Sequence, residues 1–253
     1  MKKSTLFIIA ATLLFMAACT PKQFSTRLLC YNVHNCVGID DSLSCERIAK
    51  IINDADADAV ALQELDSMTT RFPGKDMLKE LAELTGMHPT FAPSIDYRGG
   101  KYGIGMLTEQ KPLSHRRVPL PCREEPRSLL IVELPEYYYC CTHLSLHEED
   151  RITSIGIIVD ELSKLDKPAM IAGDFNARPN SEPMRLMAEH FHIFKKTEGD
   201  GLTVYSNKPV AEIDYICLYT DKGAKADITS HKVIHAPVES DHSPIVADVV
   251  ITE

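Results

Sequence analysis

Six segments of the chain place residues that can hold a metal ion or a phosphate group at the ends of apolar runs. They carry carboxylates, carboxamides and histidines, which serve as ligands and as acids and bases. The residues are Asn32, Gln63 and Glu64, His143, Asp174 and Asn176, Asp214, and Asp241 and His242. Any one could instead be a turn residue, a cap or a buried histidine with satisfied hydrogen bonds. Because α/β enzymes carry their sites at strand ends, the repetition favours one shared site.

The segment GDFNARPN, residues 173–180, contains two of these side chains directly after the apolar run AMIA. Residues two apart on a strand point to the same side. Asp174 and Asn176 would therefore aim a carboxylate and a carboxamide at one spot. The alternative is an ordinary strand end, since Gly, Asp and Asn are common in turns.

Hydrophobic patterning predicts an alternation of strands and helices that positions these residues. Strands are expected at 27–33, 58–66, 88–94, 102–109, 127–135, 137–146, 168–175, 212–219, 226–234 and 243–252. Helices are expected after Ser42 or Ser44, at 75–86 with Gly86 as C-terminal cap, at 148–164, and from about 181 to 190. In the third helix, Ile152, Ile155, Val159 and Leu162 would share one face. This mixture predicts an α/β fold with two packed sheets and helices outside.

The N-terminal segment resembles a bacterial lipoprotein signal peptide. Lys2 and Lys3 precede the apolar run LFIIAATLLFMAA, which ends directly before Cys19. An ordinary cleaved signal is the alternative. We therefore expect residues 1–18 to be removed, Cys19 to be lipidated, 19–26 to form a tether, and 27–253 to form one catalytic domain. The protein is expected to be exported, anchored to a membrane, exposed to the periplasm or the cell surface, and monomeric.

Charge and cysteine content limit the partners. The net charge is −9, and loss of two lysines and no acid with residues 1–18 makes it −11. With no basic stripe and no Trp, nucleic acid is possible but disfavoured. Cys30, Cys140, Cys141 and Cys217 lie in apolar runs and are expected to be small buried hydrophobes, whereas a disulfide between Cys36 and Cys45 stays open.

The motifs YNVHN, VALQELD, THLSL, GDFNARP, EIDYI and SDHSPI follow one another in this order. As a set they resemble the endonuclease/exonuclease/phosphatase family over residues 27–251. The resemblance implies a pancreatic-DNase-like four-layer α/β/β/α sandwich of two mixed sheets. It also implies hydrolysis of a phosphoester substrate with Mg²⁺ or Mn²⁺.

The resemblance assigns a role to each motif residue. Glu64 and Asn32 would hold the metal, and Asp241 would complete its shell or a second cation site. Asp174 would deprotonate the attacking water, and Asn176 would hold the phosphate or the nucleophile. His242, oriented by Asp214, and His143 would donate to phosphoryl oxygens. Arg127 and His34 are substrate-binding candidates, with a surface ion pair as the alternative for Arg127.

Two residues depart from the family pattern, and the substrate stays open. Cys36 stands where Gly is usual, and Glu212 where many relatives have Arg, so that an acid would repel a polyanionic strand. The favoured substrate is a small or lipid-derived phosphoester. The alternatives are an exported nuclease acting on DNA or RNA, and a non-catalytic binding lipoprotein on the same fold.

Overall fold

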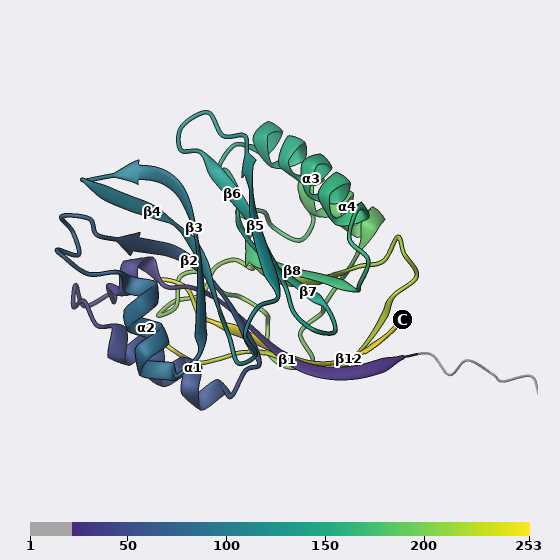
Figure 1. The fold of residues 1–253 in the computed structure, drawn as a ribbon, viewed down its shortest axis with the longest axis horizontal. Coiled ribbons are helices and arrows are strands. Elements are labelled where there is room, and N and C mark those ends of the chain that lie inside the picture. Colours follow the sequence, from purple (N-terminus) through teal and green to yellow (C-terminus); the bar gives the residue numbers. More distant parts are fainter. Residues whose placement is uncertain (1–21) are drawn as a thin grey trace, which may run out of the picture.

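The computed structural model describes residues 22–253, so the predicted signal peptide 1–18 and Cys19 lie outside the described residues. Two six-stranded mixed sheets pack face to face, and helices cover both outer faces (Figure 1). This arrangement confirms the predicted four-layer sandwich. The first strand begins at Gln23, so residues 23–26 of the predicted tether belong to a sheet. They do so because Phe24 and Thr26 are buried where this strand pairs with the last one.

The first sheet has the order β11-β12-β1-β2-β4-β3. Its strands are β1 (Gln23–Asn32), β2 (Ala59–Ser67), β3 (His88–Tyr97), β4 (Gly100–Thr108), β11 (Lys225–Val233) and β12 (Ile245–Thr252). β1 and β2 are parallel, and the other pairs are antiparallel. Helices α1 (Cys45–Ala55) and α2 (Met77–Thr85) pack on its outer face.

The second sheet has the order β5-β6-β7-β8-β10-β9. Its strands are β5 (Ser114–Leu120), β6 (Arg127–Glu133), β7 (Tyr138–His143), β8 (Ala169–Asp174), β9 (Phe191–Ile193) and β10 (Asp214–Tyr219). Helices α3 (Glu148–Ser163) and α4 (Glu182–His190) cover its outer face. The patterning did not predict β5 and β9. Both are edge strands, and β5 exposes most of its side chains, so neither carries a continuous apolar run.

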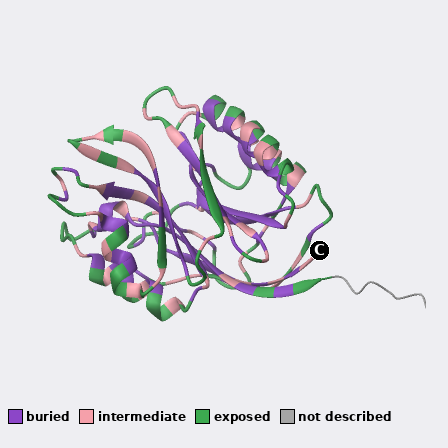
Figure 2. Cartoon of the chain, viewed as in Figure 1, coloured by how far each residue is buried: buried purple, intermediate pink, exposed green. Residues whose placement is uncertain are grey.

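Three apolar layers hold these elements together, and the central strands are buried on both faces (Figure 2). In β1, Leu28 and Cys30 face the core between the sheets, whereas Leu29 and Tyr31 face α1 and α2. Burial on both faces explains why these strands are continuously apolar. The cysteines expected to be small hydrophobes are all buried in these layers.

Helix ends follow the local sequence. The Ser44 hydroxyl accepts a hydrogen bond from the Arg47 amide at 3.3 Å, and Gly86 ends α2 with a φ of 74°. The buried face of α3 differs in part from the predicted one. Ile155 and Leu162 are buried, but Ile152 and Val159 are only half-buried. The face is rotated because Ser154 and Ile158 also pack inward.

One sequence expectation concerns the loop between β1 and α1, and another concerns the membrane. Cys36 and Cys45 are buried free thiols, so the structure forms no disulfide between them. A hydrogen bond that the Cys36 thiol donates to Cys45, together with burial, raises the pKa of Cys36. Within residues 22–253, no helix is both long and apolar enough to cross a membrane.

Candidate active site

Strand pairing brings the predicted residues to one edge of the sandwich. Parallel pairing of β7 and β8 sets His143 beside Asp174, and antiparallel pairing of β10 sets Asp214 on its other side. In the first sheet, Asn32 lies beside Gln63 at the end of β1 and β2. Gly173 permits the close approach of β7 and β8, because a Cβ there would lie 2.1 Å from the Thr142 carbonyl oxygen.

A bulge in β2 separates Gln63 from Glu64. The pairing of β2 with β4 shifts register between Leu62 and Leu65, and Glu64 has a φ of 63°. Gln63 is buried between the sheets, where its Nε2 donates to the Cys141 sulfur at 3.2 Å. Glu64 instead accepts a hydrogen bond from Asn32 Nδ2 at 3.0 Å. The left-handed backbone at Glu64 therefore turns its carboxylate toward the site, while the side chain of Gln63 stays in the core.

Asp174 is the centre of the cluster. Its Oδ2 lies 3.1 Å from Asn32 Nδ2, 3.5 Å from His143 Nε2 and 3.6 Å from His242 Nε2. Its Oδ1 accepts the backbone N–H of Asn176 at 2.9 Å. Burial, followed by the neighbouring charge of Asp214, raises the pKa of Asp174 to about 7. A carboxylate with this pKa is suited to accept a proton near neutral pH.

His242 and Asp214 form a buried pair beside Asp174. His242 Nδ1 donates to Asp214 Oδ2 at 2.9 Å. Burial alone would lower the pKa of His242, but the carboxylates of Asp214 and Asp174 outweigh it and raise the pKa to about 10. The imidazole is therefore protonated at neutral pH and offers Nε2–H as a donor. Asp214 was predicted to fix the tautomer of His242, and it lies where it can accept Nδ1–H.

His143 differs from His242 because its ring is neutral. Arg127 Nη1 lies 3.4 Å from His143 Nδ1, and because a guanidinium can only donate, Nδ1 accepts and the ring proton lies on Nε2. Burial first, and then the charge of Arg127, lower the pKa of His143 well below its usual value. Arg127 also pairs with Glu125 at 2.8 Å, so the predicted alternative of an ion pair holds alongside its place at the site. Its buried Nε has no acceptor within the described chain.

Asn176 does not share a strand face with Asp174, contrary to the alternation argument. β8 ends at Asp174, and Asn176 adopts a φ of 49° in the turn that follows. Its side-chain Nδ2 donates to the Leu144 carbonyl at 3.0 Å. The carboxamide thus ties the loop after β7 to the loop after β8, and the contact with Asp174 comes from the backbone N–H.

The remaining predicted residues surround this cluster. The His34 N–H donates to Asn32 Oδ1 at 3.1 Å, while its ring Nδ1 lies 3.0 Å from the Val37 carbonyl. Asn32 consequently presents nitrogen to Glu64 and Asp174, and its predicted role as an oxygen ligand would need a half-turn of the carboxamide. Asp241 is half-buried beside Ser240.

The donor set fits a divalent cation. One ligand atom each from Asp174, Asp214 and His242 lies within 4.8 Å of the others. Asp214 Oδ1 is buried without a hydrogen-bond partner in the described chain, as expected of a carboxylate oxygen that faces a cation. Glu64 and Asp241 do not belong to this tight group, so the predicted ligands Glu64 and Asn32 mark a neighbouring position.

The sequence did not single out several residues that shape the site. The Ser240 hydroxyl donates to the Asn32 carbonyl at 2.7 Å and accepts the His242 amide at 3.2 Å. It thereby fixes the His242 loop to the end of β1. Tyr102 lies opposite Asp66 on β4, where burial, followed by the charge of Glu64, raises its pKa. Ser240 belongs to the SDHSPI motif but was given no role of its own, and Tyr102 lies outside the motifs.

Glu212 does not present an uncompensated negative charge. Lys196 Nζ lies 2.5 Å from Glu212 Oε1 and also donates to the Asp214 carbonyl at 3.2 Å. The Lys196 side chain is only 5% exposed, so the pair is largely removed from solvent. The expected repulsion of a polyanion by Glu212 is therefore offset by Lys196. The sequence did not reveal this pair because the two residues are 16 positions apart.

A four-layer sandwich with buried aspartates and histidines at the edge between its sheets defines a class of DNase-like phosphoester hydrolases. The profile of the endonuclease/exonuclease/phosphatase family matches residues 29–242, and the chain belongs to that family. The family name spans nucleases and phosphatases, all of which hydrolyse phosphoester bonds, and its members typically depend on divalent metals.

Solved structures share the fold at low sequence identity. An endonuclease/exonuclease/phosphatase protein from Beutenbergia cavernae is 22% identical with a TM-score of 0.75, covering 89% of this chain and 71% of that one. A mannosyl-6-phosphatase from Bacteroides thetaiotaomicron is 14% identical with a TM-score of 0.69, covering 88% and 99%. The human Nocturnin catalytic domain is 18% identical with a TM-score of 0.68, covering 92% and 98%. The search of curated proteins found no match.

Proposed function

We propose that this protein is a Mg²⁺- or Mn²⁺-dependent hydrolase of a small phosphoester. The observation that carries the proposal is the surroundings of Asp174. A buried carboxylate with a pKa of about 7 lies beside one protonated and one neutral histidine. This combination supplies a base and two N–H donors to one small volume.

Each side chain has a defined task in hydrolysis. Asp174 accepts a proton from the attacking water. His242 donates Nε2–H to a phosphoryl oxygen as negative charge builds there, and Asp214 keeps its ring charged and oriented. His143 and Arg127 add neutral and charged donors to the same phosphate. Asn176 fixes the loop that carries Asp174.

A bound divalent cation would be held by Glu64 and Asn32, with Asp241 beside them, or by the Asp174, Asp214 and His242 group. When bound, it supplies positive charge that stabilises the phosphoryl and leaving oxygens. Both positions offer the carboxylate oxygens that Mg²⁺ and Mn²⁺ prefer. A cation at the Glu64 position leaves Asp174 and His242 free for their proton-transfer tasks, whereas coordination by the Asp174, Asp214 and His242 group would require His242 to lose its Nε2 proton.

We also propose that the exported protein is a monomer anchored through a lipid on Cys19. β1 runs from Gln23 to Asn32, and ten extended residues span about 30 Å. The site lies at the Asn32 end, whereas a lipid on Cys19 would join the chain four residues before the opposite end. An anchor attached at the end of β1 opposite the site leaves the site open to solution, and we therefore propose a small dissolved phosphoester in preference to a lipid of that membrane.

The nuclease alternative has less support. The chain is acidic overall, and the cations near the site are paired: Arg127 with Glu125, and Lys196 with Glu212. Affinity for DNA or RNA depends on cations that neutralise phosphates along an extended strand. Steeply salt-dependent DNA binding would revive this alternative.

The test is hydrolysis by the purified protein with Mn²⁺, Mg²⁺ or EDTA. The panel contains bis-p-nitrophenyl phosphate, p-nitrophenyl phosphate, plasmid DNA, sphingomyelin and inositol phosphates. We expect metal-dependent turnover that Asp174→Asn lowers by about 100-fold or more, the usual size of a lost general base. An unchanged unfolding temperature would show that Asp174→Asn remains folded. Absence of both turnover and metal binding would favour a non-catalytic binding lipoprotein.

A further inference from the structure

Arg71 lies in a hydrogen-bonded cluster with Asp66, two residues along β2 from the proposed metal ligand Glu64, although the mechanism above does not use it. Its Nε and Nη2 donate to the two carboxylate oxygens of Asp66 at 2.6 and 2.9 Å. Nη2 also donates to Asn35 Oδ1 at 2.5 Å. The Asp66 side chain is completely buried, whereas 28% of the Arg71 side chain is exposed. The guanidinium is thus held rigidly from one side and open to solvent on another.

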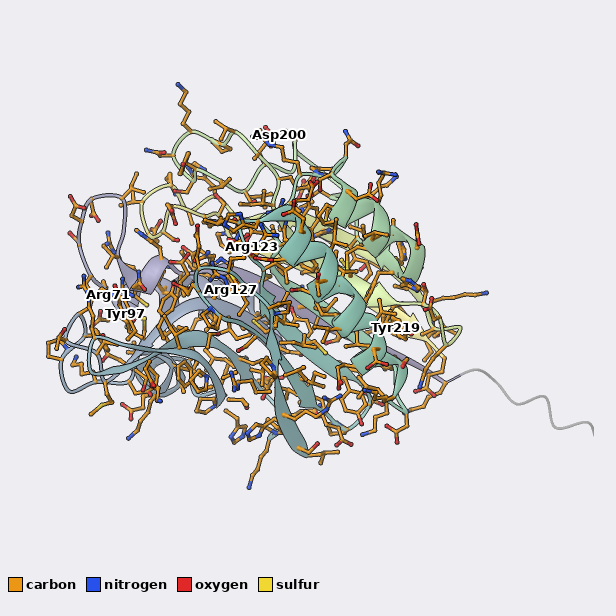
Figure 3. All side chains as sticks on the ribbon, turned by 90° about the horizontal axis from the view of Figure 1, so that it is seen from above. Arg71, Tyr97, Arg123, Arg127, Asp200 and Tyr219 are labelled. Carbon is orange, nitrogen blue, oxygen red and sulfur yellow. The ribbon has the colours of Figure 1, made fainter. Side chains whose placement is uncertain are left out.

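Two tyrosines flank this guanidinium. Its carbon lies 5.0 Å from the Tyr97 ring centroid and 5.6 Å from that of Tyr102. Figure 3 shows Arg71 and Tyr97 close together at the left of the view, with Arg127 nearer its middle. Tyr97 and Tyr102 come from the two strands of the β3–β4 hairpin, and their centroids lie 5.8 Å apart. We call Arg71, Tyr97 and Tyr102 the aromatic shelf.

The aromatic shelf adjoins the catalytic edge through two connections. Asn35, which anchors Arg71, follows His34, whose N–H bonds Asn32 of the site. Tyr102 of the shelf lies opposite Asp66, two residues after Glu64 on the neighbouring strand β2, which places the shelf at the same end of β2 as the site. A substrate whose phosphate reaches Asp174 would therefore extend its leaving group toward the shelf.

The shelf combines hydrogen-bond donors with aromatic rings, and the charge of Arg71 is offset by a carboxylate. Asp66 offsets the charge of Arg71 through two hydrogen bonds. Arg71 Nη1 nevertheless keeps its donors without a protein acceptor among residues 22–253, and Tyr102 adds a hydroxyl. Arg98 lies beside the shelf, with its guanidinium carbon 5.3 Å from the Tyr97 ring centroid, and adds positive charge there. The donors and aromatic rings of the shelf match the hydroxyls and C–H faces of a sugar or cyclitol ring.

We propose that the aromatic shelf binds the leaving group of the substrate, and that this group is a hydroxyl-rich ring, as in a hexose phosphate or an inositol phosphate. This inference rests on the proposed phosphoester hydrolysis and deepens it by naming a substrate class. Arg71 acts there as a specificity-determining residue that hydrogen-bonds ring hydroxyls. Tyr97 packs against the ring and holds the guanidinium in place.

The experiment is competition against bis-p-nitrophenyl phosphate hydrolysis by the full-length protein in detergent with Mn²⁺. The competitors are hexose 6-phosphate and methyl phosphate, two primary alkyl monoesters that differ in the ring. We expect hexose 6-phosphate to inhibit at least tenfold more tightly in the wild type. Arg71→Lys and Tyr97→Leu should each remove most of that difference and change the inhibition constant of methyl phosphate less than twofold.

Controls separate binding from a structural role. Arg116→Lys makes the same exchange in an ion pair with Glu161 on β5 and α3, far from the shelf, and should leave the selectivity intact. The unfolding temperature of each variant shows whether it is folded. If Arg71→Lys does not fold, Tyr97→Leu still tests the proposal independently. Equal wild-type inhibition by the two monoesters would overturn the proposal. An equal loss of inhibition by the two monoesters in Arg71→Lys would also overturn it, because Arg71 would then only stabilise the loops.

Two further outcomes are distinguishable from these. A hexose bisphosphate that binds over tenfold more tightly than the monophosphate, and loses that advantage in Arg71→Lys, would identify a second anion as the ligand and overturn the proposal. Absence of metal-dependent turnover of both bis-p-nitrophenyl phosphate and p-nitrophenyl phosphate would contradict the proposed function itself. Selectivity can thus fail while hydrolysis stands.

Discussion

At the scale of single residues, one environment gives neighbouring groups opposite protonation states. Asp174 and Asp214 both lie beside His242, and their negative charges keep its ring protonated despite burial. Burial and the Arg127 charge keep His143 neutral. The same desolvation raises the pKa of Asp174 into the neutral range. A base and a charged donor therefore coexist within 3.6 Å.

This pair predicts a bell-shaped pH profile of kcat/KM. Activity should rise as Asp174 loses its proton near pH 7 and fall as His242 loses its proton near pH 10. A bound cation would move the rising limb to lower pH, because positive charge favours the carboxylate. Asp214→Asn removes the largest charge that raises the pKa of His242, so the falling limb should move to lower pH. A falling limb that stays in place would contradict the assignment to His242.

At the scale of elements, the bulge in β2 decides where Glu64 points. A regular strand would alternate its side chains, and the sequence alone suggests only that Gln63 and Glu64 face opposite ways. The left-handed backbone at Glu64 and the register shift against β4 direct its carboxylate to Asn32. Cys36 also has a left-handed φ, 52°, which accounts physically for the glycine expected there.

We expect Glu64→Gln to weaken metal activation more than it impairs proton transfer. The amide keeps the shape of the side chain but loses the charge that attracts a cation. Activity at low Mn²⁺ should fall at least tenfold, and part of it should return at tenfold higher Mn²⁺. Titration of activity against metal concentration measures this effect. The control is Glu125→Gln, the same exchange at the carboxylate that pairs with Arg127. Loss that no metal concentration restores would assign Glu64 another role.

Two helix ends offer a paired test of backbone conformation. Asp56 caps α1 with a φ of 52° and is exposed, whereas Gly86 caps α2 with a φ of 74°. Glycine adopts this region without steric cost, and other residues do not. Asp56→Gly should raise the free energy of unfolding by about 0.5–1 kcal/mol, and Gly86→Ala should lower it by about 1 kcal/mol. Urea denaturation measures both, and shifts of the same sign would refute the argument.

At the scale of the whole molecule, the sandwich buries ionisable groups far from the site. His231 on β11 is completely buried, and burial followed by the Lys196 charge lowers its pKa to about 3. The unfolded chain titrates near 6.5. Between these values the unfolded state binds a proton that the folded state does not, so stability falls as the pH drops below 6.5.

Replacing His231 should therefore reduce acid sensitivity. Between pH 7 and pH 4.5, His231→Leu should lose roughly 1–3 kcal/mol less stability than the wild type, because each pKa unit corresponds to about 1.4 kcal/mol. Denaturation at both pH values gives the comparison. His115→Gln, an exposed exchange on β5, should behave as the wild type. Parallel losses in His231→Leu and the wild type would show that other groups control acid unfolding.

The sequence by itself determined the layered α/β fold, the region where α1 begins, the Gly86 end of α2, and the set of polar residues at strand ends. These follow from patterns within a few residues, because hydrophobic periodicity and capping act locally. Only the tertiary structure decided which atoms meet. Asn32 and Asp174 are 142 residues apart, and their 3.1 Å contact depends on how the two sheets pack. The bulge at Glu64, the turn at Asn176 and the pKa of Asp174 likewise depend on register and burial, which no local pattern encodes.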